Sequence, residues 1–211
     1  MRPLVLAAAG LVLAFPIAAL AADIPVDHIS LPAPAARSVH LGFPVGDLRV
    51  EASNDSRVTL EVTAHCKGWR SDDCEERAKR IRIETDASGG KIDLQVRGYP
   101  KLAGFDLRGV LRVPANMDLD LDMGVGDLRV ADVAGDLSVD LGVGDAEIRT
   151  VAGAVHSVDV AAGIGDADVI THGNHVRRHG FIGSTASWDE GRGRSSVNLH
   201  VGVGDATVRI D

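Results

Sequence analysis

The chain has 211 residues, a formal net charge of −8, 45% hydrophobic and 25% charged residues, a composition that excludes a disordered protein and argues against nucleic acid as a partner. Aromatic residues make up only 3%, whereas 24 residues are glycine. Such an aliphatic, glycine-rich composition favours thin stacked strands over a thick globular core. The length fits one domain with appendages.

The first segment has the pattern of a secretory signal. Arg2 precedes an apolar run over residues 3–20 that ends in Ala19-Leu20-Ala21. We therefore predict a signal peptide over 1–21, cleaved after Ala21, and a periplasmic or extracellular location. An uncleaved membrane anchor is the alternative, but Pro16 and the small residues at the end favour cleavage.

Residues 22–36 contain three prolines, which fix φ and remove backbone donors. We predict an extended, mobile leader here, outside the core. The rest, 37–211, is expected to be a single β-repeat domain. It divides into N-terminal strands plus a short helix over 37–115 and regular repeats over 116–211.

The N-terminal part changes its period once. Val58, Leu60 and Val62 alternate with polar residues, as in a half-buried strand. Ser71 then suits a helix N-cap and is followed by acidic residues and strong helix formers, which predicts a short helix over 71–80. Alternation resumes on both sides of Gly89-Gly90, which predicts a β-hairpin.

Two cysteines, Cys66 and Cys74, lie in the exported part. In an oxidising compartment such a pair is most simply a disulfide that closes a small loop. We expect this disulfide to pin the start of the helix to the preceding strand.

One phrase recurs along the chain: four alternating apolar residues, then Gly-Asp, then the alternation with its phase shifted. We number its occurrences copies 1 to 5, at residues 39–50, 119–130, 137–148, 158–169 and 197–210. Copy 2, for example, has Leu119, Leu121, Met123 and Val125 before Gly126-Asp127. The Gly-Asp marks of copies 2, 3 and 4 are 18 and 21 residues apart.

The phase shift at Gly-Asp predicts a bend. In a flat strand it would turn every later apolar side chain toward solvent, so the chain must bend where glycine can take positive φ and aspartate can cap the turn. Each copy has one bend at Gly-Asp, and the chain must turn once more to begin the next copy. Two bends in each repeat of about 18 to 21 residues predict a β-solenoid, resembling a parallel β-helix, of stacked two-strand rungs. An antiparallel roll is the alternative. The spacing also predicts a degenerate copy at Ser184, where serine replaces aspartate.

The alternation of apolar and polar residues continues to the end of the chain at residues 208–211, without a polar capping segment. An open rung exposes unpaired backbone, so we expect either homo-oligomerisation through an open strand edge or coverage by the N-terminal copy.

Stacked copies would align four aspartates in one column, Asp127, Asp145, Asp166 and Asp205. Two hypotheses explain how neighbouring like charges are tolerated: the side chains cap the turns, or they share calcium, as in glycine-rich β-rolls. One glycine before the aspartate, rather than the several that such rolls use, favours capping. We expect no cofactor, and calcium is the one exception that this aspartate column would admit.

Two further clusters are candidate sites. His172, His175 and His179 have a spacing that could bind zinc or copper, although Arg177 and Arg178 disfavour a cation and a solvated loop is the alternative. Trp188 with Arg192 and Arg194 is a possible binding patch for sugar or protein. Trp188 could equally fill the core where the repeat degenerates.

The segment Leu111-Arg112-Val113-Pro114-Ala115, followed by alternating apolar residues and recurring Gly-Asp, resembles the bacterial putative-adhesin family of exported β-strand-repeat proteins of unknown function. The resemblance covers about residues 37–211. That family commonly has Asn-Gly-Asp where this chain has Val-Gly-Asp, and the cysteine-bearing helix is no part of its core pattern. The resemblance implies a scaffold or surface-binding role and no particular site residue.

We therefore expect a non-enzymatic, exported structural or binding scaffold of the cell envelope, with an envelope protein or a glycan as partner. No serine lies in a recognisable catalytic arrangement. The alternatives are a calcium-stabilised β-roll and a polysaccharide-active enzyme on a β-helix.

Overall fold

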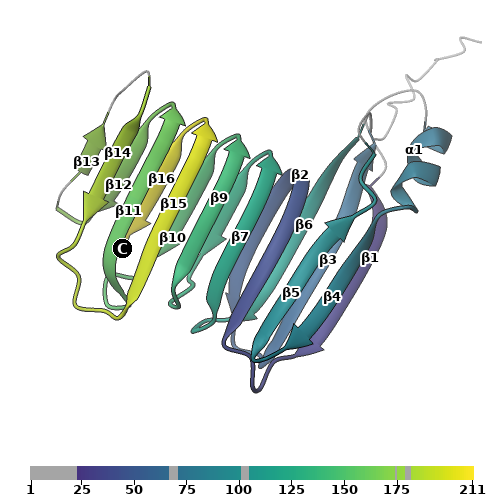
Figure 1. Cartoon of the computed structure of the whole chain (residues 1–211), viewed down its shortest axis with the longest axis horizontal. Helices are drawn as coiled ribbons and strands as arrows, with labels where there is room; N and C mark the ends of the chain where they lie inside the picture. Colours follow the sequence, from purple (N-terminus) through teal and green to yellow (C-terminus); the bar gives the residue numbers. More distant parts are fainter. Residues whose placement is uncertain (1–22, 67–70, 101–104, 174, 179–181) are drawn as a thin grey trace, which may run out of the picture.

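The computed structural model describes residues 23–66, 71–100, 105–173, 175–178 and 182–211, so the predicted signal peptide over 1–21 lies outside the described residues. The described strands form one 16-stranded sheet. This sheet folds back on itself and is nearly closed, with a front layer and a rear layer (Figure 1). The prediction of an all-β fold with one short helix is confirmed.

The N-terminal part and the repeat region have strands of different lengths. The first part contains β1 (Asp23–Pro32), β2 (Ser38–Ser53), β3 (Arg57–Cys66), α1 (Ser71–Ala78), β4 (Arg82–Ser88), β5 (Lys91–Arg97) and β6 (Phe105–Pro114). The repeat region contains β7 (Asp118–Val125), β8 (Leu128–Ala131), β9 (Leu137–Val143), β10 (Ala146–Thr150), β11 (Val155–Ile164), β12 (Ala167–Thr171), β13 (His175–Arg178), β14 (Ser184–Trp188), β15 (Ser195–Val203) and β16 (Ala206–Ile210).

Strand β2 joins the two layers because it bends in its middle. Its first half pairs in parallel with β5 and β7, and its second half pairs in parallel with β6 and β8. Gly46, at the bend, has φ +124°. Copy 1 therefore has the predicted geometry, with one Gly-Asp bend that carries the chain from one layer to the other.

Copies 2 to 5 repeat this arrangement. Their first strands β7, β9, β15 and β11 lie side by side in the front layer, and their second strands β8, β10, β16 and β12 lie in the rear layer, all parallel and in register. Leu121, Leu141, Val160 and Val201, one from each copy, are at most 2% exposed between the layers. Alternation thus builds one continuous core, as expected from the period-two pattern.

The copies do not stack in chain order, which the solenoid prediction assumed. Copy 5 lies between copies 3 and 4: β15 pairs with β9 and β11, and β16 pairs with β10 and β12. The C-terminal strand is therefore interior and not an open rung, and the predicted unpaired end at 208–211 is wrong. Copy 1 does not cover the C-terminal strand either, because the two neighbours of copy 5 are copies 3 and 4.

The insertion of copy 5 follows from an antiparallel cap. After copy 4, the chain forms β13 and β14, which pair antiparallel with β12 and β11 on their outer edges. The chain can then return only to the inner side of copy 4. Ser184, predicted in a degenerate parallel copy, instead lies in antiparallel β14 opposite Ala162. A simple solenoid is not confirmed.

Strand β1 corrects the prediction of a mobile leader. Residues 23–32 pair antiparallel with β3 along their length, and the register shifts between Pro25 and Asp27. Prolines are tolerated at a bulge and at the end of an edge strand, where a donor is not needed. The partly buried side chains of Ile24, Ile29 and Leu31 pack against the core. The prediction gave weight to the prolines and overlooked these apolar residues.

The helix, the hairpin and the disulfide confirm their predictions. Cys66 ends β3 and is bonded to Cys74 in α1. Helix α1 ends at Ala78 and not at Arg80, because the last turn tightens as the Ile81 N–H donates to the Ala78 carbonyl and Ile81 becomes buried. The hairpin pairs β4 with β5, and Gly89 and Gly90 both have positive φ. No helix among the described residues is long and apolar enough to cross a membrane.

In copies 2 to 5 the last apolar residue before Gly-Asp is exposed, although the alternation predicted it inside. Val125, Val143, Val203 and Ile164 are 42 to 46% exposed, and we call these four residues the apolar ridge. They are paired in register across neighbouring front strands. Each front strand reaches the edge of its layer one residue before the bend, so its final side chain projects past the core.

Candidate functional site

The Gly-Asp bends are stacked so closely that they admit only glycine. Gly126, Gly144, Gly165 and Gly204 all have φ of 133° or 134°, a region that other residues rarely adopt. A Cβ on Gly144 would overlap the carbonyl oxygen of Gly126, and one on Gly204 would overlap that of Gly144. The glycine of each copy is thus required by its own φ and by the backbone of the next copy.

Two of the bend aspartates, Asp145 and Asp205, cap the bend of the neighbouring copy. Asp145 Oδ1 accepts a hydrogen bond from the backbone N–H of Asp205 at 3.0 Å, and Asp205 Oδ1 accepts one from the N–H of Asp166 at 3.0 Å. At the other turn of the repeat, just before the first strand of a copy, Asp118 Oδ1 accepts a hydrogen bond from the N–H of Asp136 at 3.0 Å in the same way. Like charges are tolerated because each of these carboxylates is held by an amide donor.

The four candidate aspartates are therefore brought into one column, in the spatial order 127, 145, 205, 166. A depression of about 250 Å³ lies beside it, lined also by Arg129, Glu147 and Arg209. Within the part of the chain that the structure describes, no three acidic, histidine or cysteine side chains are grouped to hold a metal ion. The calcium hypothesis stays a prediction for experiment.

Glu147 is the centre of an ion cluster on the rear layer. Its Oε1 accepts hydrogen bonds from Arg149 Nη2 at 3.0 Å and from Arg209 Nε at 3.0 Å. These bonds, chiefly that from Arg149, hold the pKa of Glu147 below its ordinary value. Arg209 belongs to copy 5, so the cluster ties β16 to β10.

The histidine and tryptophan candidates have different outcomes. His172 is exposed in the turn after β12, His175 lies in β13, and His179 lies outside the described residues, so the metal hypothesis for these three remains a prediction. Trp188 ends β14, is half-buried and packs against the core, while Arg192 and Arg194 are exposed. The structure favours core filling for Trp188.

The two layers present chemically different outer faces. On the rear face, arginines pair with carboxylates, as Arg112 does with Glu51 at 3.5 Å and with Glu61 at 3.6 Å. The front face is acidic: strands β7, β9, β11, β14 and β15 contain no lysine or arginine but present Asp120, Asp122, Asp140 and Asp159. This face combines negative charge with a surface of in-register strands, which are parallel except for β14.

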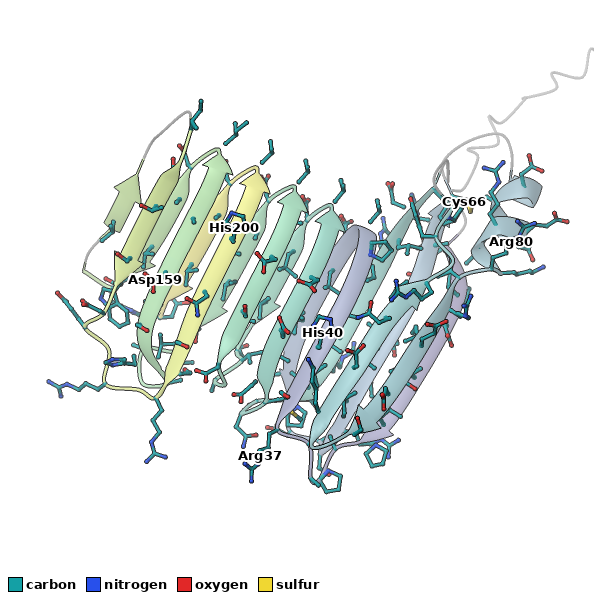
Figure 2. All side chains as sticks on the ribbon, viewed as in Figure 1. Arg37, His40, Cys66, Arg80, Asp159 and His200 are labelled. Carbon is teal, nitrogen blue, oxygen red and sulfur yellow. A yellow bond between two sulfur atoms is a disulfide. The ribbon has the colours of Figure 1, made fainter. Side chains whose placement is uncertain are left out.

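Two histidines lie among these aspartates. His40 Nδ1 is 3.1 Å from Asp120 Oδ2, and His200 Nδ1 is 3.3 Å from Asp140 Oδ1. Figure 2 shows His40, His200 and Asp159 on the same front layer. Sequence reasoning missed this face, although its signal was present in the polar residues that alternate with the core residues.

A shallow, open depression crosses the front strands β7, β9 and β15. Its volume is about 400 Å³, and it is lined by Gly124, Gly142 and Gly202 together with Asp122, Asp140 and His200. A second depression of about 400 Å³ shares Asp140 and His200 and adds short polar side chains, among them Ser138, Asp159, Thr185 and Asn198. Together they form the best candidate binding surface.

These features define an all-β repeat protein with capped, in-register copies and a flat acidic face. The sequence matches no protein-family model, and no curated protein matches it. Among solved structures, a putative cell adhesion protein from Clostridium sporogenes is 16% identical, with a TM-score of 0.51 over 89% of this chain and all of that one. This likeness shows a shared fold.

A putative adhesin from Bacteroides fragilis is 11% identical over 86% of this chain and 96% of its own, with a TM-score of 0.30. The name of the Clostridium sporogenes protein, a putative cell adhesion protein, agrees with the resemblance that the Gly-Asp repeats indicated.

Proposed function

We propose that the chain is an exported, non-enzymatic, adhesin-like scaffold of the cell envelope, in which solenoid-like stacking of the copies holds a binding face rigid. The observation that carries this proposal is the front face, where short polar side chains stand in register on parallel strands that are hydrogen-bonded on both sides. A surface so fixed loses little conformational entropy when a partner binds.

Three further observations support export and attachment. The Cys66–Cys74 disulfide suits an oxidising compartment. The amino-terminal sequence has the pattern of a signal peptide. The fold is shared with a bacterial protein named for cell adhesion.

The proposal is tested by expressing the full chain in a bacterium and fractionating the cells. We expect the mature protein to begin at residue 22 and to be found in the periplasm or at the cell surface. We also expect a strain from which the gene is deleted to attach less well to a surface coated with envelope material. Cytoplasmic protein with its signal intact would overturn the export half, and unchanged attachment would overturn the binding half.

The non-enzymatic part has its own test. Purified protein is incubated with a panel of envelope and plant polysaccharides, and new reducing ends are measured. We expect no release above the buffer control. Release that disappears in a front-face variant such as Asp159→Asn would favour the polysaccharide-active alternative.

A further inference from the structure

We propose that the protein assembles head to tail, with the front face of one copy stacked on the rear face of a second copy. This inference rests on the proposed function, since it names a partner for the same front face. Within the part of the chain that the structure describes, every element except α1 is a strand of the sheet, and α1 lies at the end of the molecule beside β1 and β3 (Figure 1). These elements therefore leave both outer faces of the repeat region uncovered.

The rear face contains two pairs of arginines, and in the described structure a carboxylate bridges one of them. Arg149 and Arg209 are in register on β10 and β16, and both donate hydrogen bonds to Glu147. Arg49 and Arg129 are in register on β2 and β8, but the Arg129 guanidinium has no ion pair with any of the described residues. Because like charges on neighbouring strands destabilise a sheet, this second pair is suited to bind an external carboxylate.

The front face offers carboxylates in the same arrangement. Three neighbouring front strands, β7, β9 and β15, contain a row in register that consists of Asp122, Asp140 and His200. Three neighbouring rear strands, β2, β8 and β10, contain a row in register that consists of Arg49, Arg129 and Glu147. Both rows cross the sheet in the same direction with the strand spacing of about 4.8 Å. A second copy shifted by one strand therefore places both arginines opposite aspartates and the glutamate opposite the histidine.

The surface is hollowed where the two rows lie. A depression of about 310 Å³ is lined by all three residues of the rear row, and one of about 400 Å³ is lined by all three residues of the front row. The front depression is also lined by Gly124, Gly142 and Gly202, which have no side chains. The long arginine side chains of one copy can therefore enter the front depression of the next copy and donate paired hydrogen bonds to its aspartates.

The row of side chains farther from the bends adds one favourable and one unfavourable pair at the same shift. Arg209 lies opposite Asp159, which adds a third arginine–aspartate pair. Glu51 lies opposite Asp120, but each of these carboxylates already has a basic partner within its own copy. The shift by one strand thus gains three ion pairs against one contact between carboxylates, which favours a second copy as the occupant.

The area of contact is close to that of a standard protein interface. Six neighbouring front strands, from β5 to β11, with about seven residues of each, give a face of about 29 Å by about 23 Å, or roughly 660 Å² per copy. Standard interfaces bury about 800 Å² per partner, so we expect association that is reversible. Because the two contact faces differ and lie on opposite sides of the molecule, the contact does not close into a dimer and extends into a chain of copies.

The test is sedimentation equilibrium of the mature chain from micromolar to millimolar concentration, in about 0.15 M salt to screen the net charge. We expect the average mass to rise with concentration beyond that of two copies. Reversal of either face, by Asp122→Lys/Asp140→Lys or by Arg49→Glu/Arg129→Glu, should weaken association at least about tenfold. One chain with all four substitutions restores opposite charges across the contact and should associate again.

The matched control, Asp55→Lys/Glu190→Lys, makes the same charge change as the front-face variant at exposed positions outside the strands and should not weaken association. Thermal melting curves show whether each variant is folded, and a misfolded chain would not regain association in the variant with four substitutions. The inference would be overturned by a mass that stays at one copy, by a closed dimer that never grows, or by loss without rescue in that variant.

The outcomes also separate this inference from the proposed function. A monomer that is still exported and still promotes attachment leaves the scaffold function standing and removes only the stacking. Cytoplasmic retention would instead remove the scaffold function, whatever the mass of the purified protein.

Discussion

The carboxylate of Asp145 accepts a hydrogen bond of 3.0 Å from the backbone N–H of Asp205, although the two residues are 60 positions apart in the chain. The bond places the last repeat copy beside the third. It also shows that the aspartate of one Gly-Asp bend can link its copy to the next. The carboxylate accepts a hydrogen bond from a backbone N–H at the neighbouring bend, which would otherwise have no partner in the sheet.

Removal of copy 5 should separate the end of the molecule from its body. Among the described strands, β11 and β12 pair with the cap strands β14 and β13 on one side and with the rest of the sheet only through β15 and β16. In a chain truncated after Arg194, we expect amides of residues 155–188 to lose hydrogen-exchange protection, while β2 and β7 keep theirs. Deletion of edge strand β1 is the control. Retained protection over 155–188 would contradict the observed order of copies.

Gly144→Ala should be strongly destabilising. The residue has φ +133°, and the added Cβ would overlap the Gly126 carbonyl, so we expect a loss of at least about 2 kcal/mol in the free energy of unfolding. Gly153→Ala is the matched control, since nothing lies within 4 Å of its Cβ position, and it should be close to neutral. Urea denaturation measures both. Equal effects would mean that the stacked bend does not require glycine.

Asp145→Ala should cost about 1 kcal/mol because it leaves the Asp205 N–H without its acceptor. Asp145→Asn keeps an acceptor oxygen and should cost less. Urea midpoints of the two variants separate the acceptor from the charge. If the asparagine variant is as unstable as the alanine variant, the negative charge, and not the hydrogen bond, is what the site needs.

Calcium should leave thermal stability unchanged. The Asp145 and Asp205 carboxylates already accept backbone N–H groups, so metal binding would have to displace or share these bonds. We expect the same melting midpoint in millimolar calcium and in chelator. A rise with calcium that is lost in Asp145→Asn would establish the β-roll alternative.

Stability should depend on Glu147 in a pH-dependent way. Because its pKa is lowered in the folded state, chiefly by the hydrogen bond from Arg149, its contribution is present above its ordinary pKa and is lost as pH falls through the lowered value. The arginines are solvent-exposed, so the contribution is below about 1 kcal/mol. Glu147→Gln should be less stable than the parent at neutral pH and equal to it in strong acid.

Urea midpoints at both pH values measure this difference, with Glu190→Gln, an exposed carboxylate outside the strands, as the control. A difference that persists in strong acid would show that Glu147 stabilises the fold by packing and not by its charge.

Local features were predictable because they depend on neighbouring residues. The hairpin at Gly89-Gly90 follows from turn chemistry, and the bend at Gly126 follows from the phase shift of its apolar neighbours. The outward position of Val125 was not predictable from alternation. It depends on where the front layer ends relative to the bend.

The acidic front face was only partly predictable. Alternation indicates that Asp120 and Asp122 share a face, but not which strands lie next to theirs. His200 comes beside Asp140 only because copy 5 is inserted next to copy 3.

The sequence by itself therefore determined the strands of the repeat copies, their bends, the helix and the disulfide, since alternation, glycine φ and cysteine pairing are local constraints. Only the tertiary structure decided the order of the copies, the capping of one end by β13 and β14, and the inclusion of residues 23–32 as a strand. The physical reason is that the edges of all copies offer nearly the same backbone donors and acceptors. The choice among them depends on long-range pairing and on the path that the antiparallel cap leaves open.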